Sequence, residues 1–153
     1  MLLSVKARYN QGNDDRATPG WIKDGLFAGW FDPCPLGASG SEFDGLEAEW
    51  SADRVFVNPP YSNPLPWVEK AIEAAENGKT VVLLLKHDSS TRWFSRLHEA
   101  GARFLAVIGR VAFTGCPAPF PSVLVVVSGL TRKESGFVPG SLDQKNVGGI
   151  KEK

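Results

Sequence analysis

The chain has 153 residues, of which 42% are hydrophobic and 22% are charged, and its formal net charge is zero. This size and composition are typical of one soluble globular domain, which we expect over residues 1–130, followed by a loosely ordered tail over 131–153. The neutral balance argues against binding nucleic acid by overall charge, so any contact with DNA would depend on a local basic rim.

The few cysteines and histidines indicate neither a metal site nor a disulfide framework. Cys34 and Cys116 lie far apart, and His87 and His98 do not complete a metal-binding pattern with them. No apolar run reaches the length of a membrane span, and the first residues do not read as a secretory signal. We therefore predict a cytoplasmic protein with reduced thiols, without a metal and without a membrane contact.

The first predicted element is a short amphipathic helix near the start of the chain. Thr18 would be its N-cap, Pro19 its first helical residue, and Gly29 its end. Residues 31–35 then read as a brief extended piece that enters a loop rich in glycine and serine.

The middle of the chain reads as a strand, a helix and a second strand. Residues 54–57 form the first strand, and residues 66–77 form a helix in which Trp67 and Ala71 fall at helical spacing. Residues 80–85 are an unbroken apolar run, as expected for a strand covered on both faces.

The last part predicts another helix over 90–100 and strand segments over 103–108 and 111–113, either separate or bent at Gly109. A very apolar strand over 122–128 follows, and we expect it to be central. Alternating strands and helices indicate an α/β fold with a mostly parallel sheet and helices on both faces. Because the final part lacks room for a crossover helix, we also expect an antiparallel C-terminal strand.

The strongest motif is Asn58-Pro59-Pro60-Tyr61, directly after the strand over 54–57. Each proline fixes φ near about −65° and removes an amide donor, so the loop is rigid and rich in acceptors. Asn58 Oδ1 and the Pro59 carbonyl can accept both hydrogens of a planar amine, while Tyr61 stacks on the attached ring. The alternative interpretation is an ordinary turn between a strand and a helix, without a functional role.

Six collinear motifs together carry a family resemblance. They are Thr18-Pro19, Phe31-Asp32-Pro33-Cys34, Asp44-Gly45-Leu46 with Trp50, Val57-Asn58-Pro59-Pro60-Tyr61 followed by Pro66-Trp67, Thr91-Arg92-Trp93-Phe94, and Gly109-Arg110 through Ala118-Pro119-Phe120-Pro121-Ser122. On these residues the chain resembles the phage-type DNA N6-adenine methyltransferases. The resemblance implies a phage or prophage protein of a bacterial host cell. It also implies a reduced Rossmann-like fold that uses S-adenosylmethionine to methylate the N6 amine of adenine in DNA, the base being flipped out or single-stranded.

The resemblance also implies three sets of site residues. The catalytic set is Asn58, Pro59, Pro60 and Tyr61. The cofactor-binding set is Thr18, Pro19, Asp32, Pro33, Cys34, Asp44 and Asn58. The set that contacts DNA is Tyr61, Lys86, Arg92, Trp93, Arg110 and Phe120. Structural interpretations stay open beside these roles: Asp32 and Asp44 suit ordinary turns, Trp93 suits the core, and the cations suit a solvated surface.

The stretch before the Asn-Pro-Pro-Tyr motif is short. About 25 residues separate Asp32 from Asn58, and a single βαβ unit takes roughly 30 or more residues. We therefore expect a sheet that is reduced on this side, with Asp32 or Asp44 providing the acidic contact to the cofactor.

Several alternatives remain at this point. The same tetrad would suit another planar amine, such as guanine N2 in RNA, cytosine N4 in DNA or a protein glutamine amide. A non-catalytic binding module with the same fold is a further alternative. A homodimer is compatible with a domain this small, because one copy covers little of a DNA duplex.

Overall fold

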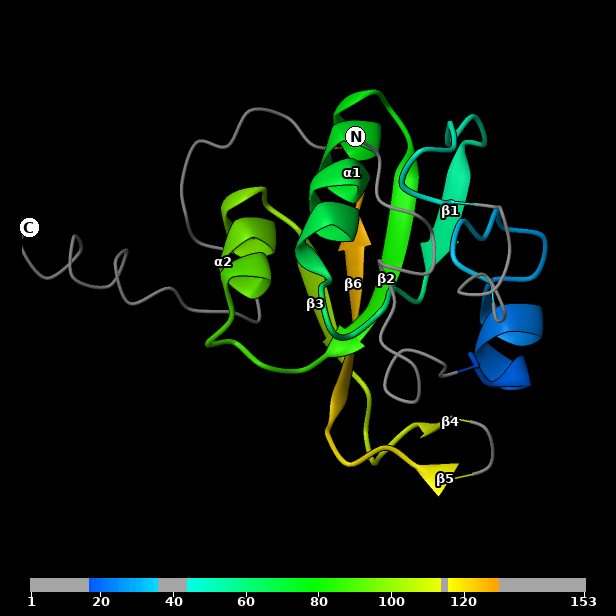
Figure 1. Ribbon diagram of the computed structural model, residues 1–153, viewed down its shortest axis with the longest axis vertical. Coiled ribbons are helices and arrows are strands. Elements are labelled where there is room, and N and C mark those ends of the chain that lie inside the picture. The colour runs from blue at the N-terminus through cyan, green and yellow to red at the C-terminus, as the bar shows by residue number, and fades with distance from the viewer. Residues whose placement is uncertain (1–16, 36–43, 114–115, 130–153) are drawn as a thin grey trace, which may run out of the picture.

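The computed structural model describes residues 17–35, 44–113 and 116–129 (Figure 1). The predicted tail over 131–153 lies outside these ranges. Within them the elements, in chain order, are η2 (Trp21–Leu26), β1 (Arg54–Val57), α1 (Leu65–Glu76), β2 (Thr80–Lys86), α2 (Arg92–Glu99), β3 (Arg103–Ala106), β4 (Ala112–Phe113), β5 (Cys116–Pro117) and β6 (Ser122–Val127). The α/β class is therefore confirmed.

The main sheet has the strand order β1-β2-β6-β3. β1 and β2 are parallel, whereas β6 is antiparallel to both of its neighbours. The antiparallel C-terminal strand and its central place were predicted correctly. The mostly parallel sheet was wrong, because the insertion of β6 between β2 and β3 makes two of the three strand pairs antiparallel.

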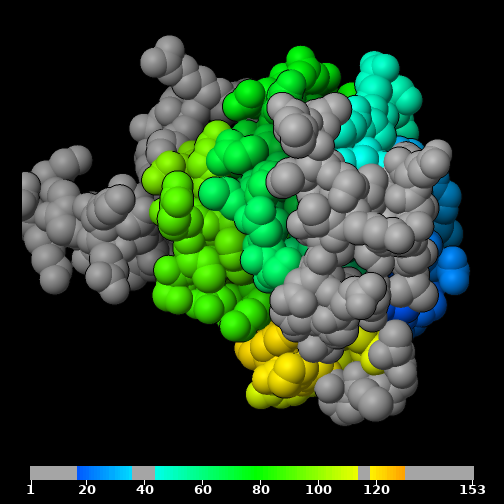
Figure 2. Space-filling model, in the orientation of Figure 1, coloured from blue at the N-terminus to red at the C-terminus, as the bar shows by residue number. Residues whose placement is uncertain are grey.

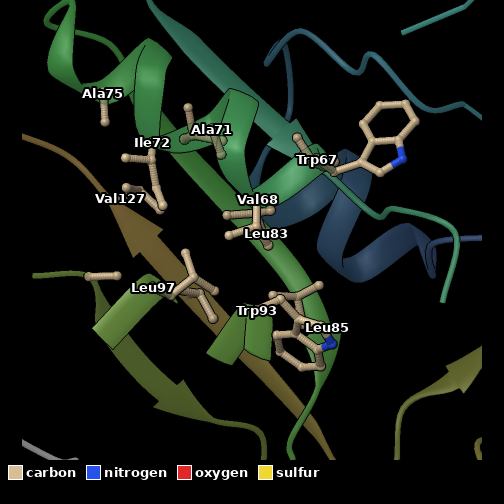
Figure 3. Packing of buried hydrophobic residues seen from close by; sticks show 14 of the residues in the cluster. Trp67, Val68, Ala71, Ile72, Ala75, Leu83, Leu85, Trp93, Leu97 and Val127 are labelled. Carbon is tan, nitrogen blue, oxygen red and sulfur yellow. The ribbon is translucent and has the colours of Figure 1, made fainter. Parts of the chain in front are cut away.

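Alternation along the strands divides the core into two layers. One face of the sheet packs under α1 and α2, and Figure 3 shows Val68 of α1 beside Leu83 and Trp93 of α2 beside Leu85. The two helices lie next to each other on this face (Figure 2). An ion pair between Arg96 Nε and Glu69 Oε1, 2.9 Å apart, joins them.

The opposite face is covered by η2 and by the segment that contains β4 and β5. Buried Ile22 of η2 and Phe113 of β4 pack there against Phe56 of β1 and Leu84 of β2. In the described part of the chain, α1 and α2 thus lie on one face of the sheet, and η2 is the only helical segment on the opposite face.

The N-terminal helix differs from its prediction. It is a six-residue π-helical segment whose N-cap position is Gly20, and no side chain caps it. The carbonyl of Pro19 accepts hydrogen bonds from the amides of Ile22 and Lys23, each at 3.0 Å. Thr18 was expected to be the cap, but it lies two residues before the N-cap position, and its hydroxyl bonds elsewhere in the fold, as described below.

The later helix boundaries follow their local sequence signals. α1 begins beside Pro64 and Pro66, and its buried residues include Trp67 and Ala71, as the spacing predicted. α2 is capped by Thr91, whose hydroxyl accepts a hydrogen bond from the Phe94 amide at 3.3 Å. β3 ends at Ala106 instead of Ile108, and Gly109, with φ +78°, turns the chain toward β4.

Candidate active site

Three chain segments meet at one edge of the main sheet, where β1 and β2 end and β6 begins. Because β1 and β2 are parallel, the residues after both strands, Asn58 and His87, lie at the same edge. β6 runs in the opposite direction, so it begins at this edge with Ser122, paired to Lys86. The His87 amide donates to the Pro121 carbonyl at 2.8 Å and joins the two segments. Ligands in open α/β sheets bind at the carboxyl ends of strands, which is this edge.

Asn58 is buried at the end of β1, with 8% of its surface exposed. Its Nδ2 donates to Thr18 Oγ1 at 3.0 Å, and its Oδ1 accepts from the Tyr61 hydroxyl at 3.0 Å. Thr18, which the sequence analysis assigned to the cofactor, is therefore a direct partner of Asn58. The two hydrogen bonds fix which end of the amide faces which neighbour.

Tyr61 lies between the tetrad and two further aromatic rings. Its hydroxyl is also 3.4 Å from the carbonyl oxygen of Leu84, so its hydrogen has two acceptors within reach. The ring makes edge contacts with Phe113, at 6.0 Å between centroids, and with Phe120, at 5.2 Å. The predicted residue Phe120 is thus next to Tyr61. Phe113 was not predicted as a site residue, and it reaches the site through the path of β4.

The segment that contains Asp32, here called the first acidic loop, extends the sheet beyond β1. Phe31 pairs with Val55 in a parallel bridge, through N–H···O bonds of 3.1 Å to Arg54 and 2.9 Å from Phe56. Asp32 therefore follows a short strand-like piece at the same edge as Asn58.

The carboxylate of Asp32 already has two protein contacts. Asp32 Oδ1 accepts from the Cys34 amide at 2.9 Å, and its Oδ2 lies 3.3 Å from Lys23 Nζ. The turn interpretation is correct for this residue, and the carboxylate keeps unused lone pairs.

The segment that contains Asp44, here called the second acidic loop, packs directly against the first acidic loop. Asp44 Oδ1 accepts from the Leu46 amide at 2.9 Å, which forms an Asx turn. Gly45 is so close to the first loop that a Cβ added there would lie 1.9 Å from the Pro33 carbonyl oxygen. The structure thus brings together Asp32, Pro33 and Asp44, three of the residues predicted to bind the cofactor.

Two tryptophans and a lysine anchor the second loop on α1. Trp50 Nε1 donates to the Gly45 carbonyl at 2.8 Å, and the rings of Trp50 and Trp67 stack with 6.4 Å between centroids. Figure 3 shows Trp67 directed away from Val68 and Leu83.

Lys70, one turn after Trp67, adds the third anchor. Its Nζ donates to the Leu46 carbonyl at 2.7 Å and also to the Ala48 carbonyl. Burial lowers the pKa of Lys70, although nearby acidic residues oppose the shift. Lys70 was not predicted as part of the site, since a lysine on an amphipathic helix does not indicate which loop it contacts.

The predicted basic contacts lie at this edge by topology. Lys86 ends β2, Arg92 begins α2, and Arg110 follows the turn after β3; all three are exposed. Lys86 Nζ is 3.9 Å from Asp88 Oδ2. Hydrogen bonds from Ser90 lower the pKa of Asp88.

Trp93 requires a correction. We predicted it as a contact to DNA, but only 8% of its surface is exposed and it belongs to the core layer beneath α2. Its side chain packs beside Leu85 (Figure 3). The burial of Trp93 therefore supports the interpretation as a core residue over a contact to DNA.

The described ranges contain neither a metal-binding cluster nor a membrane-spanning helix. No three side chains among histidine, cysteine, aspartate and glutamate gather there as a metal site would require. No helix in the same part of the chain is long and apolar enough to cross a bilayer.

Comparison with known proteins identifies the family. The family model for DNA N-6-adenine-methyltransferase (Dam) matches residues 39–139. The chain belongs to the Dam family. The resemblance inferred from the six motifs is thereby confirmed.

Two phage proteins are similar to this Dam family chain. A DNA N-6-adenine-methyltransferase of Haemophilus phage HP1 is 52% identical over 50 residues, which span 32% of the chain and 29% of the relative. A DNA N-6-adenine-methyltransferase of Escherichia phage T1 is 38% identical over 61 residues, which span 39% of the chain and 26% of the relative. The match thus covers less than a third of the length of each curated relative.

The range matched by the Dam family model includes most of the site. It contains the tetrad, Asp44 and Phe120, whereas Thr18 and Asp32 precede it. The two residues outside the match are nevertheless bound to the site, Thr18 through Asn58 and Asp32 through the contact of Pro33 with Gly45.

Proposed function

We propose that this protein transfers the methyl group of S-adenosylmethionine to the exocyclic N6 amine of adenine in DNA. The observation that carries the proposal is the fixed amide of Asn58 at the carboxyl edge of the sheet, with Oδ1 directed to Tyr61 and Nδ2 bonded to Thr18. The names of the two phage relatives support adenine in DNA over other planar amines.

Asn58 acts as an acceptor for the amine. Adenine N6 is a weak nucleophile because its lone pair is delocalised into the ring. Hydrogen bonds from the amine to Asn58 Oδ1 and to the Pro59 carbonyl favour a pyramidal nitrogen, and they stabilise the positive charge that develops on it during attack. The excess proton is lost to water after transfer.

Tyr61 changes its partner when the base binds. In the base-free protein its hydroxyl donates to Asn58 Oδ1, the acceptor that the amine needs. The carbonyl of Leu84, 3.4 Å away, can take over this hydrogen. The ring can then stack on the extruded base, and Phe113 and Phe120 support it from their edge contacts.

The two acidic loops are the proposed cofactor site. S-adenosylmethionine, when bound, supplies an electrophilic methyl group, and it carries an ammonium group and ribose hydroxyls that donate hydrogen bonds. The carboxylates of Asp32 and Asp44 fit this donor set, because carboxylate oxygens accept hydrogen bonds from ammonium and hydroxyl groups. Trp50, Trp67 and Lys70 keep the second loop in position.

The fold is accordingly proposed to be a reduced Rossmann-like methyltransferase sheet. The parallel unit β1-α1-β2 supports this, since both of its strands end at the proposed site. The residues proposed to contact DNA phosphates are Lys86, Arg92 and Arg110, which are exposed around the same edge. A homodimer remains part of the proposal, and sedimentation with and without DNA tests it.

Methylation of defined substrates tests this function. The protein is incubated with labelled S-adenosylmethionine and separate DNA, RNA and protein fractions, and the products are digested and analysed by mass spectrometry. We expect N6-methyladenine in DNA. Label in guanine, cytosine or glutamine would replace the proposed substrate, and absence of both turnover and cofactor binding would favour a binding module.

A matched pair of variants links the activity to the site. Asn58→Ala should abolish turnover and leave binding of the cofactor, measured by calorimetry, mostly unchanged. Asn63→Ala is the control, because Asn63 lies in the same loop but is exposed. Near wild-type turnover of Asn58→Ala would contradict the proposed mechanism.

A further inference from the structure

The hydroxyl of Ser122 is a buried polar group without a partner. Ser122 is fully buried, and its Oγ has no hydrogen-bond partner. Its backbone is satisfied, since the residue pairs with Lys86 and its carbonyl accepts from the Val107 amide at 3.2 Å. The rest of β6 is valine and leucine. An unpaired buried hydroxyl is costly and rare in native proteins, so its presence needs an explanation.

Ser122 lies on the same face and the same edge of the sheet as the tetrad. Side chains alternate along a strand, so Ser122 shares its face with Leu124, which packs with Phe56, Leu84 and Phe113. Leu84 pairs with Leu124, and it is therefore the diagonal neighbour of Ser122. Such neighbours are separated by about 7–8 Å.

Two contacts connect this position to Tyr61. The carbonyl of Leu84 is 3.4 Å from the Tyr61 hydroxyl, and Phe120, two residues before Ser122, packs on the Tyr61 ring. Ser122 is thus the diagonal neighbour of one residue that contacts Tyr61 and lies two positions along the chain from another.

We infer that the Ser122 hydroxyl donates a hydrogen bond to a ring nitrogen of the extruded adenine, beside the amine that Asn58 binds. This inference rests on the proposed function. Adenine N1 and N7 both flank the amine and accept hydrogen bonds, and a serine hydroxyl is a donor. Because Ser122 is fully buried in the base-free protein, the inference requires the side chains around it to shift when the base enters the site.

The inference predicts opposite effects of one substitution on stability and activity. Ser122→Ala removes a buried, unpaired hydroxyl, so the melting temperature should rise by about 2–4 °C. The same change should lower kcat/KM for DNA roughly tenfold, the effect of one hydrogen bond. A purely structural role would lower the melting temperature instead.

Ser128→Ala is the matched control. Ser128 follows the same strand at the opposite edge of the sheet, where its hydroxyl bonds Thr80 Oγ1 at 2.9 Å. Its loss should not raise the melting temperature and should leave kcat/KM unchanged.

Base analogues identify the partner atom. Oligonucleotides carrying 1-deazaadenine or 7-deazaadenine at the target position lack one ring nitrogen each. We expect one analogue to lower kcat/KM of the wild type roughly tenfold and to cause no further loss in Ser122→Ala. Losses that multiply for both analogues, or wild-type kcat/KM of Ser122→Ala on adenine, would overturn the inference.

The two failures are distinguishable. If the wild-type protein methylates adenine and Ser122→Ala does so equally well, only the role of Ser122 is wrong. If the wild-type protein methylates no adenine in DNA, the proposed function fails, and the inference fails with it.

Discussion

Two neighbours bond the two ends of the Asn58 amide and orient it. Tyr61 takes Oδ1 and Thr18 takes Nδ2. An asparagine without these partners would rotate and offer either end to the amine. Thr18 is thus a positioning residue for the proposed reaction, and its effect can be separated from that of a cofactor contact.

Replacing Thr18 by valine tests this role. Thr18→Val removes the acceptor for Nδ2 at nearly constant volume, so kcat should fall about 3- to 10-fold, as expected for one neutral hydrogen bond. Thr18→Ser keeps the acceptor and should restore most of the rate. Steady-state kinetics measure kcat, and calorimetry measures the affinity for the cofactor. Weaker cofactor binding with unchanged kcat would instead assign Thr18 to the cofactor.

Tyr61 should act through its ring more than through its hydroxyl. Tyr61→Ala removes the stacking surface, worth about 1–3 kcal/mol per base, so KM for DNA should rise by about 5- to 150-fold. Tyr61→Phe keeps the ring and frees Asn58 Oδ1, so KM for DNA should stay within a few-fold of the wild type. Kinetics with DNA as the varied substrate separate the two variants. An equal loss in both would show that the hydroxyl carries the function.

At the scale of elements, the two acidic loops behave as one unit. Gly45 contacts the Pro33 carbonyl so closely that no side chain fits between the loops. Trp50 and Lys70 bond the carbonyls of the second loop and fix it to α1. Movement of either loop should therefore disturb the other.

Gly45→Ala should separate the loops. The added Cβ overlaps backbone atoms that cannot rotate away, so the variant should lose about 1–3 kcal/mol of stability and bind S-adenosylmethionine more weakly. Gly20→Ala is the control, because its Cβ would meet nothing closer than Asp24 Oδ2 at 3.8 Å. Thermal melting and calorimetry measure both effects. Unchanged cofactor binding in Gly45→Ala would place the cofactor elsewhere.

Sequence patterns predicted where the elements lie in the chain better than they predicted which elements are neighbours in space. The spacing of Trp67 and Ala71, and the apolar run of β2, report burial directly, so both elements were predicted correctly. Apolarity also indicated that β6 is central, but it carries no information on direction. The mostly parallel sheet was wrong for that reason.

The candidate site was predictable where it is contiguous in the chain. The Asn-Pro-Pro-Tyr tetrad and the strand before it are adjacent, so their geometry could be inferred. One partner of Asn58, Thr18, lies 40 residues away, and no periodicity in the sequence links the two residues. Lys70 and Phe113 were missed for the same reason, because tertiary folding alone brings them to the site.

For the whole molecule, a net charge of zero limits the attraction to DNA. Binding should depend on the few exposed cations at the edge where β1 and β2 end. The logarithm of affinity should fall with the logarithm of salt concentration by about 0.9 for each phosphate contact.

Arg92→Ala should reduce this salt dependence by about 0.9. Arg103→Ala is the control, because Arg103 is also exposed but begins β3 at the opposite edge of the sheet. Fluorescence anisotropy with labelled DNA over a range of salt concentrations measures the slopes. Equal slopes for the wild type and Arg92→Ala would show that Arg92 does not contact a DNA phosphate.

The insertion of β6 between β2 and β3 has a consequence for biosynthesis. β2 and β3 are translated before β6, yet neither is paired with the other in the finished sheet. While the ribosome is still translating the segment that precedes Ser122, the side of β2 that later pairs with β6 has no strand partner. A nascent chain stalled there would expose an unpaired apolar strand to other chains. Premature termination should therefore yield aggregates and not a shorter folded protein.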